Sequence, residues 1–190
     1  THHGTFDLAY LRSIPNLTIM IPRDQIMLEK MLETGLSLHR PVAIRYPREK
    51  VVAQPLKGHK VRPGRLEVLK KGMKAMVFCA GPLCYTALEA VSDLDDVGVA
   101  DLVFAKPIDA KSVREHVAAC GGRFVVVEDG CTHGGVGSAI LEVLQDIDVP
   151  LKFRLVGIPD RFIEHGSLSD LRNIIGLDAQ GIRKAVREVM

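Results

Sequence analysis

Residues 123–140 read RFVVVEDGCTHGGVGSAI, and this stretch decides the fold. Residues 124–127 form an unbroken apolar run, which is typical of a strand buried on both faces of a parallel sheet. The glycines that follow permit a sharp reversal into a helix. The expected apolar stripe of that helix consists of Gly137, Ile140, Leu141 and Leu144. The stretch therefore predicts a strand, a turn and a helix.

The glycine turn admits two interpretations. Backbone N–H groups at a helix N-terminus attract anions, so residues 134–138 could cradle a phosphate. The sequence GGVGS, however, lacks the spacing of a dinucleotide-binding loop and the Lys-Ser/Thr pair of a P-loop. We favour close packing of the turn and helix. Glu128 and Asp129 are then structural caps for the turn and not a catalytic pair of carboxylates.

Strand and helix patterns alternate along most of the chain, after an opening stretch, residues 1–15, that reads as a loop. The expected strands are residues 17–21, 41–46, 65–69, 74–79, 97–104, 124–127 and 151–156. Of these, 74–79 reads as central, and 65–69 and 151–156 read as edges. Expected helix starts lie at Asp24, Pro82, Asp109, Ser167 with Asp170, and Asp178. The pattern predicts an α/β fold, a mostly parallel sheet with helices on both faces.

Two finer expectations follow from the same pattern. The first concerns the helix after Asp24. Its expected buried stripe is Leu28, Met31, Leu32 and Leu36. The second concerns the carboxyl ends of the strands, where ligands bind in such sheets. These ends are residues 45–48, 79–82, 106–109, 128–133 and 157–161.

The chain divides into two units. Residues 51–63 contain glycine and proline without apolar periodicity, which indicates a linker. We expect residues 1–52 to be one strand–helix–strand piece of a larger domain, 53–63 the linker, and 64–190 an α/β domain. The first piece is too small to fold alone. Because the sequence opens at Thr1 without a methionine, we expect position 1 to be interior to a longer protein.

Composition excludes several classes of function. The 25 basic and 23 acidic side chains give a formal charge of +2, which offers no support for nucleic-acid or anionic-membrane binding. No stretch approaches the roughly 20 apolar residues of a membrane span. The cysteines, Cys79, Cys84, Cys120 and Cys131, lack zinc-binding spacing, and His133 lacks a second ligand. We expect reduced core thiols in a cytosol-like compartment.

Two places carry candidate chemistry. His2 and His3 lie in the opening loop, where an imidazole could exchange protons near neutral pH; the alternative is an ordinary loop or a tag remnant. Arg45 and Arg48 flank Tyr46-Pro47 at a strand end. A guanidinium there could bind a phosphate or carboxylate bidentately. The alternative is a pair of solvated basic residues.

Several strings together resemble the 1-deoxy-D-xylulose-5-phosphate synthase family. They are THHGTFDLAYLRSIPNLTIMIP, PVAIRYPR, FAKPIDA, VVVEDGCTHGGVGSAI, GIPDRFIEHGS and GLDAQGI, in order from Thr1 to the last helix. The resemblance covers the whole chain and about the last third of such an enzyme. RYPR and GGxGS occur more widely in transketolase-like proteins, including β subunits of 2-oxo acid dehydrogenases, whereas IPDRFIEHGS and GLDAQGI favour the synthases.

The resemblance implies a thiamin-diphosphate- and magnesium-dependent transferase. It joins pyruvate, with decarboxylation, to glyceraldehyde 3-phosphate, and the product feeds isoprenoid, thiamin and pyridoxal synthesis. His2 matches the family's histidine at the reacting centre, and Arg48 matches its ligand for the phosphate of the acceptor. Thr132-His133 replaces the apolar pair expected before GGxGS.

The resemblance also implies an incomplete chain. The family's diphosphate- and magnesium-binding domain and its activating glutamate lie upstream, so we expect these 190 residues to bind no cofactor and to be inactive alone. The expected partners are the missing N-terminal portion and a second copy in a homodimer. The expected location is the bacterial cytoplasm or the plastid stroma. A rival hypothesis is an independent binding or assembly module that holds a nucleotide or anion at residues 134–138.

Overall fold

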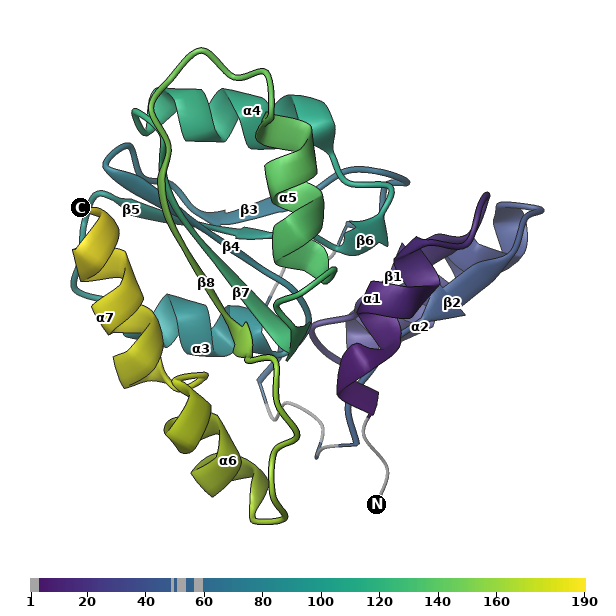
Figure 1. Cartoon of the computed structure of the whole chain (residues 1–190). Coiled ribbons are helices and arrows are strands. Elements are labelled where there is room, and N and C mark those ends of the chain that lie inside the picture. The colour runs from purple at the N-terminus through teal and green to yellow at the C-terminus, as the bar shows by residue number, and fades with distance from the viewer. Residues whose placement is uncertain (1–3, 49, 51–53, 57–59) are drawn as a thin grey trace.

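A computed structural model describes residues 4–48, 50, 54–56 and 60–190 (Figure 1). Its helices are the 3-10 turn η1 (Gly4–Phe6), α1 (Asp7–Arg12), α2 (Gln25–Ser37), α3 (Leu83–Ala90), α4 (Ala110–Ala119), α5 (Val136–Leu144), α6 (Leu168–Ile175) and α7 (Ala179–Val189). Its strands are β1 (Thr18–Met20), β2 (Val42–Ile44), β3 (Glu67–Lys70), β4 (Ala75–Cys79), β5 (Val97–Asp101), β6 (Phe104–Lys106), β7 (Arg123–Cys131) and β8 (Lys152–Ile158).

The larger sheet has the strand order β3-β5-β4-β7-β8. Strands β5, β4, β7 and β8 are parallel, and β3 is antiparallel to β5. All residues of β4 are buried, as the apolar run predicted for a central strand. The predictions of a mostly parallel sheet, with β3 and β8 at its edges, are confirmed.

Helices cover both faces of this sheet (Figure 1). On one face α4 and α5 pack through Val117 and Ile140 against Phe78 and Phe124. On the other face α3 and α7 pack against the intervening residues of β4 and β7, whose side chains point to that side. Cys84, Ile182 and Val186 lie in that core. The alternation of apolar residues to opposite sides of β4 and β7 supplies both cores from the same strands.

The predicted caps are present. Asp24 accepts a hydrogen bond from Met27 N, and Asp109 accepts one from Ser112 N. Ser167 and Asp178 cap α6 and α7 in the same way. Each cap satisfies an N–H group that has no partner within its helix.

The smaller sheet has the order β2-β1-β6, and it corrects the expectation of one strand over residues 97–104. The chain leaves β5 at Asp101, reverses at Val103, whose φ is 60°, and enters β6, which pairs antiparallel with β1. Asp101 Oδ1 stabilises this reversal by accepting a hydrogen bond from Val103 N at 2.9 Å. The loop at 106–109 therefore follows a strand of the smaller sheet, and Asp109 still reaches the carboxyl edge of the larger one, where it accepts a hydrogen bond from Leu66 N beside β3 at 3.3 Å.

Two other expectations were wrong. Residues 1–15 were read as a loop, but η1 and α1 occupy most of the described part. In α2 the buried residues are Met27 and Met31, so Met31 of the expected stripe is confirmed, Leu28 is half-buried, and Leu32 and Leu36 are 54% and 83% exposed. Met27 and Met31 pack with Val103 and Phe104, the segment that carries the chain into β6. Apolar residues occur on both sides of α2, so periodicity alone did not identify the buried side.

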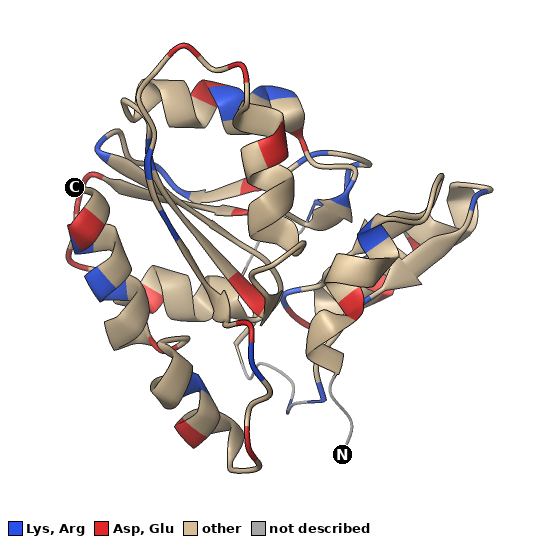
Figure 2. Ribbon diagram, viewed as in Figure 1, with Lys and Arg blue, Asp and Glu red and all other residues tan. Residues whose placement is uncertain are grey.

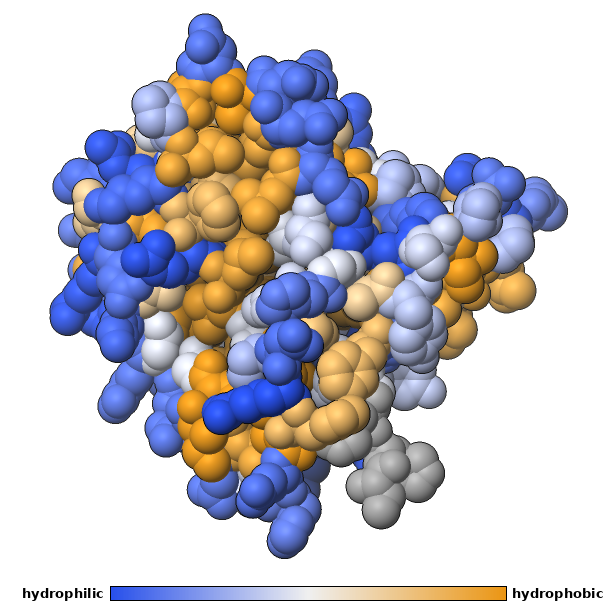
Figure 3. Space-filling view, viewed as in Figure 1, coloured by the Kyte–Doolittle hydropathy of each residue, from blue (hydrophilic) through white to orange (hydrophobic). Residues whose placement is uncertain are grey.

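Charged residues are spread over the outer faces of the helices and loops (Figure 2). The space-filling view shows apolar side chains gathered over α6 and the neighbouring loop, with polar groups around them (Figure 3). Exposed residues of that area include Phe162, Leu168 and Ile174. Within the described residues, no helix combines the length and the apolar character needed to cross a bilayer.

Candidate functional site

The RYPR stretch follows β2 and places its two arginines differently. The Arg45 side chain is 12% exposed and turns inward. Its Nη2 donates to Asp129 O at 2.7 Å and its Nη1 to Asp129 Oδ2 at 3.2 Å. Its Nε lies 3.4 Å from Asp7 Oδ2. Arg45 therefore joins the ends of β2 and β7 to the start of α1.

Arg48 is exposed and lines a pocket of about 360 Å³. The other lining residues are Pro22, Arg23, Asp24, Gln25, Leu28, Tyr46, Pro47, Lys50 and Pro82. The open side carries two cationic side chains, Arg48 and Lys50, beside apolar and proline residues. A guanidinium beside a partly apolar wall suits a phosphorylated small molecule, because the fork binds the phosphate and the wall excludes water.

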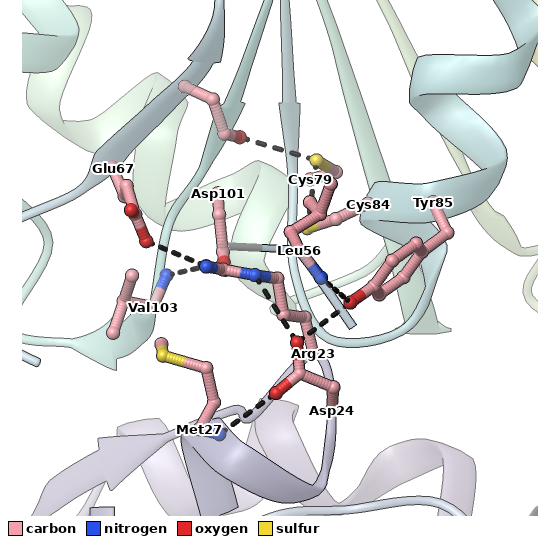
Figure 4. A network of polar contacts seen from close by, with 11 residues as sticks. Arg23, Asp24, Met27, Leu56, Glu67, Cys79, Cys84, Tyr85, Asp101 and Val103 are labelled. Atoms are coloured by element: carbon pink, nitrogen blue, oxygen red, sulfur yellow. Dashed lines mark hydrogen bonds and ion pairs between the residues drawn. The ribbon is translucent and has the colours of Figure 1, made fainter. Parts of the chain in front are cut away.

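Beneath this pocket Arg23 is completely buried. Figure 4 shows its polar contacts. Its Nη1 donates to Asp101 Oδ2 and to Glu67 Oε2, both at 2.8 Å, and its Nε lies 3.6 Å from Asp24 Oδ2. Burial alone would lower the pKa of Arg23, but the hydrogen bonds to Asp101 and Glu67 outweigh it and raise that pKa. Burial raises the pKa of Asp101 to about 6, against the opposing effect of Arg23.

Tyr85 extends this network to α3 (Figure 4). Its hydroxyl donates to Asp24 Oδ2 at 2.7 Å and accepts from Leu56 N at 3.1 Å. Burial, with the hydrogen bond to Asp24, raises the pKa of Tyr85 to about 12. The Tyr85 hydroxyl thus connects α3 both to Leu56 of the linker and to the Asp24 carboxylate at the beginning of α2.

The glycine turn holds an anion that the chain supplies itself. Glu128 accepts hydrogen bonds from Val136 N at 2.7 Å and Gly137 N at 3.0 Å, the N–H groups that begin α5. Burial raises the pKa of Glu128, although these N–H groups oppose the shift. The prediction of Glu128 as a structural cap is confirmed, and its carboxylate occupies the N–H groups that a phosphate would need. The same prediction for Asp129 was wrong, because its carboxylate contacts Arg45 and Arg172.

Arg12 closes the same turn from outside. Its Nη1 donates to Gly134 O at 2.5 Å and Gly135 O at 2.7 Å, and its Nη2 pairs with Glu142 at 2.8 Å. Arg12 ties the first 48 residues to the glycine turn and α5, and Arg23 and Arg45 tie them to the larger sheet. No local spacing in the sequence indicated these contacts, because the partners in these hydrogen bonds lie 38 to 130 positions away.

The remaining candidates are His2, His3, His133 and the cysteines. His2 and His3 lie outside the described residues; Gly4 is the next described residue of the same segment. His133 is exposed. The four cysteines are free and buried, which confirms them as core residues. Cys79 Sγ lies 3.0 Å from Cys84 Sγ, and burial raises the pKa of both thiols.

The described residues do not fit a diphosphate with its magnesium ion. Across residues 4–48, 50, 54–56 and 60–190, no three His, Cys, Asp or Glu residues come together as a metal-binding group. The helix N-terminus best suited to a phosphate is filled by Glu128. The exposed cationic side chains that line the described pocket are Arg48 and Lys50.

Comparison with known families identifies the class of protein. Residues 64–182 match the family described as "Transketolase, C-terminal domain", and residues 1–53 match "Transketolase, pyrimidine binding domain". The chain belongs to the transketolase family, and its α/β fold is that of this family.

Curated relatives define a narrower group. The chain is 43% identical over 188 residues to 1-deoxy-D-xylulose-5-phosphate synthase of Thermus thermophilus, covering 98% of this chain and 30% of the relative. The enzyme of that name from Aquifex aeolicus is 40% identical over 195 residues, covering 100% of this chain and 31% of the relative. The resemblance stated from the sequence strings is confirmed. The chain spans about 30% of the length of these relatives.

Solved structures agree on the fold. A chain described as "Split gene transketolase, inactive beta4 tetramer" matches with a TM-score of 0.85 and 29% identity, covering 96% of this chain and 60% of that chain. The transketolase from Leishmania mexicana matches with a TM-score of 0.73 and 20% identity, covering 95% of this chain and 26% of that one. The second match concerns the fold alone.

Proposed function

We propose that this chain is the C-terminal third of a 1-deoxy-D-xylulose-5-phosphate synthase. The observation that carries the proposal is the identity of 38–43% to synthases of that name along essentially the whole chain. The proposed reaction joins pyruvate, with loss of carbon dioxide, to the aldehyde carbon of glyceraldehyde 3-phosphate. The product is 1-deoxy-D-xylulose 5-phosphate, a precursor for isoprenoid, thiamin and pyridoxal synthesis.

Within that reaction the chain contributes two side chains. Arg48 binds the phosphate of the acceptor, and its exposure in a pocket with Lys50 and an apolar wall supports this role. His2 donates a hydrogen bond at the reacting centre, where a developing oxyanion needs a placed donor. Its role rests on the THHG string, because the side chain lies outside the described residues.

The rest of the catalyst belongs to an upstream portion. Thiamin diphosphate and magnesium supply the decarboxylation chemistry when that portion binds them. In this division residues 1–52 complete a pyrimidine-binding domain, 53–63 form a linker and 64–190 form the C-terminal domain. We place the complete enzyme, as a homodimer, in the bacterial cytoplasm or the plastid stroma; the relatives quoted above are bacterial.

The isolated chain is inactive in this proposal. The similar solved chain is described as an inactive split-gene transketolase, which supports the expectation. The described residues also lack a metal-binding group.

The test compares the full-length protein with the isolated chain. Each is incubated with thiamin diphosphate, magnesium, pyruvate and glyceraldehyde 3-phosphate, and product is followed by mass spectrometry. We expect 1-deoxy-D-xylulose 5-phosphate from the full-length protein and none from the isolated chain. Full-length protein that consumes neither substrate would overturn the synthase assignment. Product from the isolated chain would overturn the proposal that the rest of the catalyst belongs to an upstream portion.

A further inference from the structure

Arg45 connects the two segments to which the proposed site residues belong. It lies three positions before Arg48 in the same loop, and its Nε contacts Asp7, which lies five positions after His2. Its other two nitrogens hold Asp129 at the end of β7, through the backbone carbonyl at 2.7 Å and the carboxylate at 3.2 Å. All three guanidinium nitrogens therefore make polar contacts, and these contacts link the loop of Arg45 to the segment of Asp7 and to β7.

The burial of these groups makes the connection rigid. The side chains of Arg45, Asp7 and Asp129 are 12%, 21% and 18% exposed. Arg172 of α6 lies 3.9 Å from the same Asp129 carboxylate, so β7's end is held from a second side. A planar fork with three fixed contacts restrains orientation as well as distance, which a single lysine contact does not.

We propose that Arg45 is a positioning residue, which fixes the segment carrying His2 and the loop carrying Arg48 relative to each other against the end of β7. This inference rests on the proposed function. Arg45 itself faces Asp7 and Asp129, away from the pocket of Arg48, and so does not touch substrate. Its contribution is geometric, and misplacement of a catalytic group by about 1 Å can reduce the rate by about 100-fold.

Arg12 provides a matched control. Its side chain is 14% exposed, against 12% for Arg45, and it likewise makes three polar contacts that tie α1 to the larger domain. Arg12 lies at the opposite end of α1 and holds the glycine turn. A purely structural contribution of Arg45 would therefore resemble that of Arg12 in both stability and activity.

The experiment uses the full-length protein with Arg45→Gln and Arg12→Gln. We expect both variants to lower the melting temperature by similar amounts. We expect Arg45→Gln to reduce kcat/KM for glyceraldehyde 3-phosphate by at least about tenfold. Arg12→Gln should stay within about twofold of wild type, since it leaves the contacts of Arg45 in place. Equal losses of activity in the two variants would overturn the inference.

A third variant tests the contribution of the His2 segment separately from that of the Arg48 loop. Asp7→Ala releases the His2 segment while Arg45 still holds Asp129, so kcat should fall while KM for glyceraldehyde 3-phosphate stays near wild type. A rise in KM with unchanged kcat would contradict the proposed geometry.

Hydrogen exchange gives a readout that needs no synthase activity. In Arg45→Gln, peptides covering residues 2–8 and 45–50 should exchange faster than in wild type, whereas Arg12→Gln should leave both unchanged. Unchanged exchange in Arg45→Gln would overturn the inference even for an active enzyme. Faster exchange in Arg45→Gln, in a protein that lacks synthase activity, would support the positioning role of Arg45 and reject the proposed function.

Discussion

Arg23 donates from Nη1 to Asp101 Oδ2 across 2.8 Å, and neither side chain is exposed to solvent. The two residues come from different sheets: Arg23 follows β1, and Asp101 ends β5 at the point where the chain turns toward β6. The smaller sheet is therefore joined to the larger one by a buried ion pair as well as by a continuous backbone. This link lies directly beneath the pocket of Arg48.

Replacing Arg23 with methionine should strongly destabilise the chain. The change leaves Asp101 buried without its cationic partner, and loss of one partner of a buried ion pair costs about 3–5 kcal/mol. Chemical denaturation near neutral pH measures the effect. The additional replacement Asp101→Leu should recover part of the loss, because it removes the uncompensated carboxylate. Lys111→Met, which removes an exposed pair with Glu115, is the control, and an equally small effect of Arg23→Met would contradict the prediction.

The stability of the chain should also depend on the ionisation of Asp101. Burial raises its pKa to about 6 from an ordinary 3.8, so the folded chain holds this proton more tightly than the unfolded chain. Its stabilising contribution is complete below about pH 4 and is lost as the pH rises to about 6. Relative to Asp101→Asn, the unfolding free energy should fall over this range by on the order of 3 kcal/mol. Denaturation curves at a series of pH values would contradict this if the difference were constant or rose.

The elements with one clear periodicity were predictable from sequence. The buried runs of β4 and β7, and the caps Asp109 and Asp178, depend on local patterns, and the structure contains them as expected. The division of residues 97–104 was not predictable in this way. Both halves are apolar, and only the tertiary pairing of β6 with β1 requires the reversal at Val103.

Prediction of the site residues from local sequence patterns was limited in the same way. The RYPR string identified Arg48 as a candidate, and the resemblance gave it a role. The inward contacts of Arg45 and Arg23 depend on carboxylates distant in sequence, which no local spacing reveals. The glycine turn was ambiguous for a related reason. An anion at a helix N-terminus was the correct physical expectation, but the anion is Glu128, from the preceding strand.

Gly135→Ala should disrupt the start of α5. A Cβ atom at this position would collide with the Glu128 carboxylate and with Cys131 O, so the carboxylate must leave Val136 N and Gly137 N. Overpacking and the lost hydrogen bonds together should destabilise the chain by about 2 kcal/mol. Gly130→Ala is the matched control, because its Cβ would meet only ordinary contacts at 3.5 Å and beyond. Thermal unfolding of the two variants tests the difference, and similar melting temperatures would contradict it.

His2→Ala should lower turnover in the full-length protein more than it lowers substrate affinity. A hydrogen-bond donor that acts on developing charge stabilises the transition state more than the bound substrate. Steady-state kinetics with pyruvate and glyceraldehyde 3-phosphate measure the two effects separately. His3→Ala is the neighbouring control. A wild-type kcat for His2→Ala would remove His2 from the reacting centre.

Arg48→Ala should mainly raise KM for glyceraldehyde 3-phosphate in the full-length protein. Loss of a charged contact to phosphate is worth about 1.5–3 kcal/mol, which corresponds to roughly a 10- to 100-fold change in KM. Unphosphorylated glyceraldehyde provides the internal control, since an acceptor without phosphate loses nothing when the guanidinium is removed. Arg40→Ala, at an exposed position before β2 and outside the pocket, controls for the general loss of positive charge. If KM for both acceptors rose together, Arg48 would support the shape of the pocket and another group would bind the phosphate; an unchanged KM for glyceraldehyde 3-phosphate would remove it from the site.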